Sequence, residues 1–133
     1  MSVKKILIGV LIVFIIIAVA GGMTLKIITD RADADLQKLL AVEIKEVDLS
    51  KIENGTYTGT YQAFPIEVEV KVVVADQKIT DIDLVKHNTG KGQAAEALPT
   101  KVVETQSLKV DTITGATYSS KVILLAIQDA LSK

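Results

Sequence analysis

Hydrophobic and polar positions follow three successive patterns along this chain of 133 residues. The first is an apolar run over residues 6–23, without a charged side chain, directly after Lys4 and Lys5. As a helix rising about 1.5 Å per residue, the run reaches roughly 27 Å, close to the hydrocarbon core of a bilayer. The run predicts a membrane-spanning anchor. Because residues 18–20 read Ala-Val-Ala, a cleaved signal peptide is the alternative.

Basic residues beside the apolar run predict its orientation. Lys4 and Lys5 precede it, whereas Lys26 and Arg31 follow it. The first pair lies tight against the run, and the tail before it is very short. We therefore expect a single-pass protein of the cell membrane, with its N-terminus inside and the bulk of the chain on the extracytoplasmic side.

The second pattern is a helical spacing of apolar residues between Ala32 and Val47, in a segment with few helix breakers over 29–47. We interpret residues 24–53 as a helical stalk or linker. It either packs on the folded domain, which we favour, or acts as a spacer or self-association stripe. If wholly helical, it would extend up to about 45 Å.

The third pattern, from residue 54 onward, is an alternation of period two. Asn-Gly at residues 54–55 signals a turn, and residues 55–62, 66–74 and 79–85 each alternate apolar or aromatic with polar side chains. A short polar link over 75–78 favours an antiparallel hairpin. The pattern predicts a three-stranded meander with one solvated face.

Helical patterns then return. We expect a short helix over 93–98, a second opening at Pro99, an extended stretch at 109–112 and a last, largely buried helix over 117–131. The predicted class is α+β: a small antiparallel sheet with packed helices, preceded by one N-terminal transmembrane helix.

These elements predict three parts. They are a cytoplasmic tail and transmembrane anchor at 1–23, a helical stalk at 24–53 and a folded domain at 54–133.

Composition narrows the chemistry. The chain has no cysteine, one histidine (His87) and a formal net charge of −1. Missing cysteine excludes disulfides, thiolate iron–sulfur ligation and c-type haem attachment, and a lone histidine is a poor start for a zinc site. The sequence has no strongly basic stretch of the kind that indicates nucleic-acid binding. Any redox chemistry therefore needs an organic cofactor rather than a metal.

Serine and threonine residues crowd positions 112–120, beside Gly115-Ala116 and just before the last helix. Small residues leave the backbone open to a bulky group, and a helix N-terminus favours a phosphate. A threonine hydroxyl placed there is suited to forming a phosphoester. The alternative is a cluster of helix N-cap residues.

Asp111 to Thr117 reads Asp-x-x-Thr-Gly-Ala-Thr, which resembles the flavinylation motif of the FMN-binding domain family. That family includes the flavin subunits of sodium-pumping quinone reductases and of ferredoxin-oxidising membrane complexes. The resemblance extends over residue 54 to the C-terminus through the segments 54–59, 79–82, 87–88 and 106–107. After His87 it departs from the longer members, because residues 88–92 lack their Glu-Thr-Pro-Gly-like segment.

The resemblance implies FMN bonded to Thr117 through a phosphoester and donated from FAD by a separate flavin transferase. Gly115 and Ala116 would let the backbone and the transferase approach. Thr114 is a candidate hydrogen-bond donor to the phosphate. Asp111 is the motif acid, with a role in orienting the loop or binding the transferase's metal, or simply in capping the turn.

Other polar residues are weaker candidates. His87 is a candidate flavin contact, with a structural role as the alternative. Tyr57 and Tyr61 could stack on the flavin ring but more often such residues simply pack. We expect Ser119 and Ser120 to start the helix rather than to bind a ligand.

The function implied is electron transfer by a membrane-anchored flavoprotein, as a carrier or subunit rather than a complete enzyme. FMN accepts two electrons together or one at a time, so it can join unlike redox partners. The expected partners are the flavin transferase, a membrane donor (quinol or dehydrogenase), a redox acceptor protein and the bilayer, without nucleic acid. The alternatives are a non-covalent flavin or ligand-binding module and a structural subunit of a membrane complex.

Overall fold

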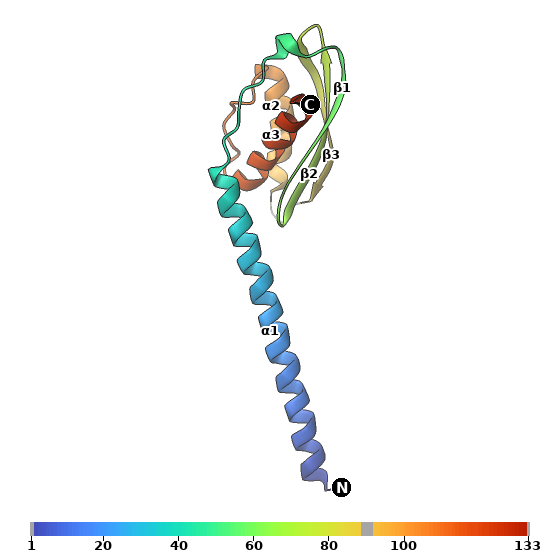
Figure 1. Ribbon diagram of the computed structural model, residues 1–133, viewed down its shortest axis with the longest axis vertical. Coiled ribbons are helices and arrows are strands. Elements are labelled where there is room, and N and C mark those ends of the chain that lie inside the picture. The colour runs from blue at the N-terminus through green and yellow to red at the C-terminus, as the bar shows by residue number, and fades with distance from the viewer. Residues whose placement is uncertain (1, 89–91, 133) are drawn as a thin grey trace. The chain divides into compact units, whose positions relative to one another are not determined.

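The computed structural model describes residues 2–88 and 92–132, which divide into two compact units at residues 1–34 and 35–133. The first unit consists of the greater part of helix α1 (Val3–Ala41) (Figure 1). Its large apolar side chains are exposed, and the helix is long and apolar enough to cross a membrane. The predicted N-terminal apolar helix is therefore confirmed.

The last turns of α1 belong to the second unit. Leu39 is buried and Leu36 packs against the same core, so the predicted packing of this stretch on the domain is confirmed for these two residues. The helix ends at Ala41, and the expectation of helix over 42–47 is wrong. These residues form no regular element, and Val42 and Ile44 pack on the core while Glu43 between them is exposed.

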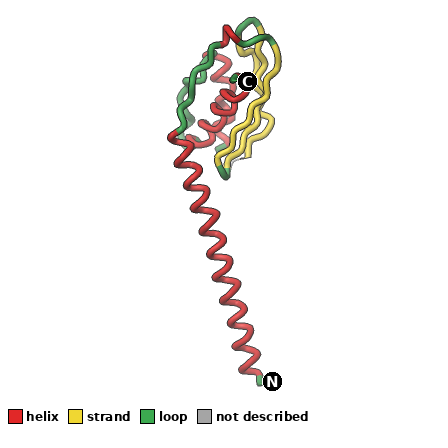
Figure 2. The backbone as a smooth tube through the Cα atoms, in the orientation of Figure 1, coloured by secondary structure: helices red, strands yellow, loops and turns green. Residues whose placement is uncertain are grey.

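The second unit contains a three-stranded antiparallel sheet in the order β1-β2-β3 (Figure 2). Its strands are β1 (Gly55–Ala63), β2 (Ile66–Ala75) and β3 (Lys78–Asn88). The predicted meander is confirmed, and β3 runs three residues beyond the predicted end at Val85. The sheet has one buried and one solvated face because the strands alternate. β2 buries its apolar positions, Ile66, Val68, Val70, Val72 and Val74.

Two-residue hairpin geometry sets the β2–β3 register next to the turn, and the register shifts between Val73 and Val74 and again between Glu69 and Val70. Asp76 and Gln77 form the loop, both with positive φ (52° and 62°), as a type I′ turn requires. The side chain of Asn54 holds this turn, because its Oδ1 accepts a hydrogen bond from the Asp76 N–H at 2.9 Å. The Asn-Gly pair at the start of β1 thus supports the neighbouring hairpin.

Helices cover the buried face of the sheet (Figure 1). A 3₁₀ turn, η2 (Gln93–Ala97), leads into α2 (Leu98–Thr105), which packs on β3, and α3 (Thr117–Leu131) packs on β1 and β2. The last helix has the predicted bounds and is largely buried, as expected. Residues 109–112 belong to no strand, so the expected extended element is not regular structure.

Gly59 allows β1 and α3 to approach closely. A Cβ atom there would lie 2.0 Å from the Ala126 carbonyl oxygen and 2.4 Å from the Ala130 nitrogen, closer than real Cβ contacts. Beside this contact, the Thr60 N–H donates to Asp129 Oδ2 at 2.9 Å. Backbone packing therefore fixes how α3 lies along the strand.

Two irregular segments, residues 42–54 and 106–116, run along α3 on the side away from the sheet (Figures 1 and 2). Glu46 joins them: its carboxylate accepts hydrogen bonds from Ser107 Oγ at 2.6 Å and from the Leu108 N–H at 3.1 Å. Burial raises the Glu46 pKa, but these bonds and nearby Lys109 outweigh it, so the pKa lies below its usual value.

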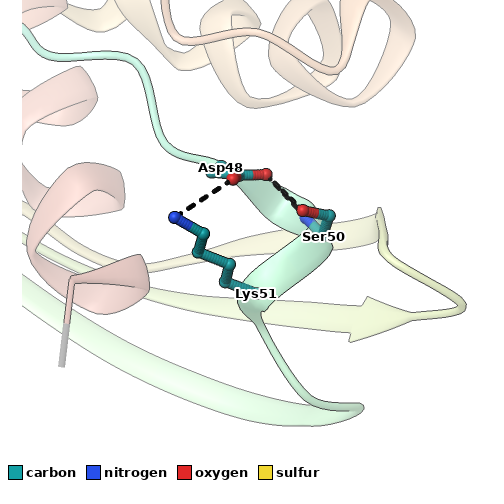
Figure 3. A network of polar contacts seen from close by, with 3 residues as sticks. All are labelled: Asp48, Ser50 and Lys51. Atoms are coloured by element: carbon teal, nitrogen blue, oxygen red, sulfur yellow. Dashed lines mark hydrogen bonds and ion pairs between the residues drawn. The ribbon is translucent and has the colours of Figure 1, made fainter.

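The first segment also contains the 3₁₀ turn η1 (Leu49–Lys51) (Figure 3). Asp48 caps it by accepting hydrogen bonds from the Ser50 hydroxyl at 2.6 Å and from the Ser50 N–H at 3.1 Å. Lys51 lies 3.6 Å from the same carboxylate. The Ser50 hydrogen bonds lower the pKa of Asp48, so the cap stays charged to a lower pH than an ordinary aspartate would.

Gln106 completes the outer edge of β3. It ends α2 in the left-handed conformation (φ 55°), and its side-chain amide pairs with Ile79 in the manner of a strand. Gln106 Oε1 accepts from the Ile79 N–H at 2.7 Å, and its Nε2 donates to the Ile79 carbonyl at 2.7 Å and to the Val103 carbonyl at 2.6 Å. The amide thereby satisfies backbone groups at an otherwise open sheet edge.

Candidate functional site

The loop that leads into α3 contains a tight turn built on glycine. The Ala116 N–H donates to the Ile113 carbonyl at 2.9 Å, and Gly115 has a φ of +81°. Thr114 does not have a positive φ, so the pair matches a type II turn, which requires a residue with positive φ at its third position. A Cβ on Gly115 would meet nothing within 4 Å. Glycine is thus needed here for conformation, and the space beside it is open.

Ser120 fixes this turn to the first turns of α3. The Ile113 N–H donates to Ser120 Oγ at 3.0 Å, and Ser120 is fully buried. Ser119 is also buried. Both therefore lie at the start of the helix with their side chains away from solvent, which agrees with the prediction that they are helix-start residues rather than ligands.

Thr117 is the first residue of α3, and it is exposed. The preceding residue, Ala116, is the N-cap and offers no side-chain hydrogen bond to the helix. The first N–H groups of a helix lack intrahelical partners and carry partial positive charge. The sequence therefore presents a threonine hydroxyl to solvent at the positive end of a 15-residue helix.

The other predicted motif residues lie in the same loop. Thr114, at the second position of the type II turn, is exposed, as are Gly115 and Asp111. Ala116 is buried, with 5% of its surface exposed, so it anchors the loop to the core. The motif is thus a surface loop held at Ala116, with its polar side chains and its glycine open to an approaching group.

His87 lies outside this loop, near the end of β3 and directly opposite Val68 of β2. Its side chain is only 3% exposed, and its Nδ1 lies 3.1 Å from Glu96 Oε1 on η2. Its Nε2 is buried and has no hydrogen-bond partner among the residues that the structure describes. The ring therefore links β3 to η2 from within the core. Its assignment as a flavin contact stays a prediction.

The two ends of α3 have different surroundings. At its N-terminal end, Lys121 Nζ donates to the Leu40 carbonyl in the last turn of α1 at 2.9 Å. At its C-terminal end, an open hollow of about 600 Å³ is lined by Tyr57, Gln128 and Leu131 together with the segment 45–53. This hollow is separated from Thr117 by the length of the helix, roughly 21 Å. It is therefore not part of the Thr117 site.

The tyrosines expected to pack do so. Tyr57 and Tyr61 are partly buried against the core, and the Tyr57 hydroxyl donates to the Glu53 carbonyl at 2.7 Å. Sequence reasoning missed Lys121, and it placed Gln106 only in a segment that resembles the family, without its pairing with Ile79. The position of Lys121, four residues after Thr117, was a usable signal because such pairs share a helix face.

The surroundings of Thr117 fit the phosphate group of FMN. A phosphoester on the exposed Thr117 would have open space beside Gly115 and a helix N-terminus without a side-chain cap. The same exposure leaves the loop accessible to a modifying enzyme. A flavin held there would be tethered at the surface rather than enclosed.

Comparison with known proteins identifies the family to which this domain belongs. The sequence matches the FMN-binding domain family over residues 61–132, more than half of the chain. The chain is therefore a member of the FMN-binding domain family, as its motifs suggested, and FMN is the cofactor of that domain.

The chain is also similar to a curated relative, the NADH:acrylate oxidoreductase of Vibrio harveyi. The two are 31% identical over 107 residues, which make up 78% of this chain and 11% of that protein. The chain thus spans about a tenth of the relative's length, and the likeness concerns one part of a larger redox protein.

Proposed function

We propose that this protein is a membrane-anchored flavoprotein that carries FMN covalently on Thr117 and passes electrons between a membrane donor and an acceptor. The observation that carries the proposal is the exposed Thr117 hydroxyl at the first residue of α3, directly after the Gly115 turn. Membership in the FMN-binding domain family supports the cofactor, and the likeness to a named oxidoreductase supports a redox role.

The covalent step is a transfer from FAD catalysed by a separate flavin transferase. The Thr117 oxygen forms a bond to the phosphorus of the FMN half, and the phosphoanhydride bond of FAD breaks. AMP leaves with the bridging oxygen, and the threonine proton goes to a base of the transferase. The step needs no oxidant or reductant, and this chain contributes only a reachable hydroxyl on a fixed loop.

Each motif residue has a distinct part in holding the phosphate. Gly115 and Ala116 keep the backbone free of bulk, and Ala116 also anchors the loop in the core. Thr114 is exposed on the same turn and would donate a hydrogen bond to the phosphate. Asp111 would orient the loop towards the transferase and its metal.

The apolar part of α1 is proposed as the membrane anchor. In this division, residues 1–23 form the tail and anchor, residues 24–53 the linker and residues 54–133 the domain. Its exposed apolar side chains suit a lipid environment, and Lys4 and Lys5 favour a cytoplasmic N-terminus. The domain would then lie on the extracytoplasmic side of the cell membrane. A covalent tether suits that location, because an extracytoplasmic flavin that dissociates is lost.

When bound, FMN supplies one- and two-electron chemistry. The protein supplies the tether, the electrostatic environment and access for partners. A surface flavin is reachable both by a quinol or dehydrogenase in the membrane and by a redox acceptor protein.

Peptide mapping tests the site of attachment. The full chain would be co-expressed with a flavin transferase and targeted outside the cytoplasm, denatured and digested, and the peptides would be sequenced by mass spectrometry. We expect FMN on Thr117, no FMN in Thr117→Ala, and full loading in the matched control Thr112→Ala, which changes another exposed threonine of the same loop. Flavin on a different residue, or flavin lost on denaturation, would refute the assignment.

A further inference from the structure

Lys121 lies one helical turn beyond Thr117 on α3. Residues four apart share a helix face, with their Cβ atoms about 5–6 Å apart. Helical side chains lean towards the N-terminus, so the long side chain of Lys121 extends back over the turn that presents Thr117. Helix geometry thus places Lys121 on the same face as Thr117, one turn from the residue that would bear the phosphate.

The ammonium group of Lys121 is held in place. The residue is partly buried, and its Nζ donates to the Leu40 carbonyl at 2.9 Å. That carbonyl lies in the last turn of α1, where helix carbonyls lack intrahelical partners and carry partial negative charge. A lysine ammonium has three donors, so the bond to Leu40 leaves capacity for a second acceptor.

Charge at this end of α3 makes Lys121 important for a phosphate. The first turn of α3 contains no acidic residue, and Lys121 is the first charged residue of the helix. The preceding segment contributes one charge of each sign, Lys109 and Asp111, and of these Asp111 lies within the motif itself. A phosphodiester on Thr117 adds a negative charge beside Asp111, and a cation on the same helix face would offset their repulsion.

We propose that Lys121 is the cationic partner of the phosphodiester on Thr117 and that it bridges this group to the Leu40 carbonyl at the end of α1. This inference rests on the proposed covalent attachment of FMN. Lys121 is a positioning residue: it fixes the phosphate end of the flavin tether to the last turn of α1 and takes no part in electron transfer itself.

The test compares FMN-loaded and flavin-free full chain in detergent, the latter made without transferase. The variants are Lys121→Gln, which removes the charge, Lys121→Arg, which keeps it, and Lys101→Gln, an exposed lysine of α2 that gives the same change in net charge. Intact mass first establishes loading. The readouts are the rise in thermal midpoint on loading and the ³¹P resonance of the native phosphodiester.

We expect loading to raise the midpoint by several degrees in the wild type, Lys101→Gln and Lys121→Arg, and by much less in Lys121→Gln. The ³¹P resonance should move only in the Lys121 variants, and added salt should shrink the gain in the wild type. Equal gains and an unmoved ³¹P resonance in Lys121→Gln would overturn the role of Lys121 alone. If the wild type takes up no covalent flavin beside an active transferase, both proposals are wrong.

Should Lys121→Gln fail to fold in its flavin-free form, the salt dependence of the wild type decides. A gain on loading that is insensitive to salt would then contradict a charge pair.

Discussion

The close approach of β1 and α3 makes Gly59 the position where a single methyl group should do most damage. In Gly59→Ala the added Cβ would lie 2.0 Å from the Ala126 carbonyl oxygen and 2.4 Å from the Ala130 backbone nitrogen. To reach even a 3.0 Å contact with that oxygen, the strand must move away from the helix by about 1 Å. Backbone atoms cannot move aside by side-chain rotation. The substitution therefore pushes β1 away from α3 and loosens the packing of the core between them.

Overpacking of this kind typically costs about 1–3 kcal/mol, occasionally more. We expect the upper end, about 3 kcal/mol, because the obstacles are backbone atoms. Removing glycine from a strand interior would by itself stabilise by roughly 0.5–1 kcal/mol, which is too little to compensate. For a domain of this size, a loss of about 3 kcal/mol lowers the thermal midpoint by about 12 °C or more.

Gly55→Ala is the matched control in the same strand. A Cβ at Gly55 would meet only the Tyr57 side chain, no closer than 3.8 Å, which is ordinary contact. Thermal unfolding of the full chain in detergent, followed by circular dichroism, should show a large loss for Gly59→Ala and almost none for Gly55→Ala. Equal midpoints for the two variants would show that β1 and α3 do not pack as described.

Three further predictions concern side-chain hydrogen bonds. Gln106→Ala removes the strand-like pairing with Ile79 and should destabilise the domain by about 1–3 kcal/mol in urea unfolding, because it leaves partly buried backbone groups without partners. The pKa of Glu46 in the folded domain lies below the usual 4.5. The ionised carboxylate therefore stabilises the folded domain above pH 4.5, and this stabilisation is lost as pH falls through the lowered folded pKa. Thermal midpoints measured across that acidic range should therefore fall less steeply for Glu46→Gln than for the wild type. The difference should be small because this carboxylate is mostly exposed, and parallel curves for the two proteins would refute the linkage. Ser120→Ala removes the acceptor that holds the Ile113 N–H, so we expect about 1 kcal/mol of destabilisation and a slower flavinylation time course, whereas an unchanged time course would show that the turn does not depend on this bond.

The sequence predicted the elements whose burial follows a simple period. The alternation in β2 and the apolar spacing of α3 are properties of single segments, so both could be read directly from the chain. The motif loop was equally accessible, because Gly115 and the threonines around it have local conformational preferences. The structure places them on one surface turn at the start of α3, as expected.

The predictions were wrong or incomplete where contacts between distant segments decide the conformation. Residues 42–47 have a spacing compatible with a helix, yet α1 ends at Ala41, and Val42 and Ile44 pack against the core in a segment without regular structure. The pairing of Gln106 with Ile79 joins residues that are 27 positions apart. The contact of Lys121 with Leu40 spans 81 positions, and no local pattern predicts it.

The central claim, a covalent FMN on Thr117, is tested most directly by the intact mass of the denatured full chain. The protein would be co-expressed with a flavin transferase and targeted outside the cytoplasm, together with Thr117→Ala and a domain known to accept FMN as a positive control. We predict a gain of one FMN minus one water in the wild type and no gain in Thr117→Ala. An unmodified wild-type mass, from a preparation in which the control domain is fully modified, would contradict the account.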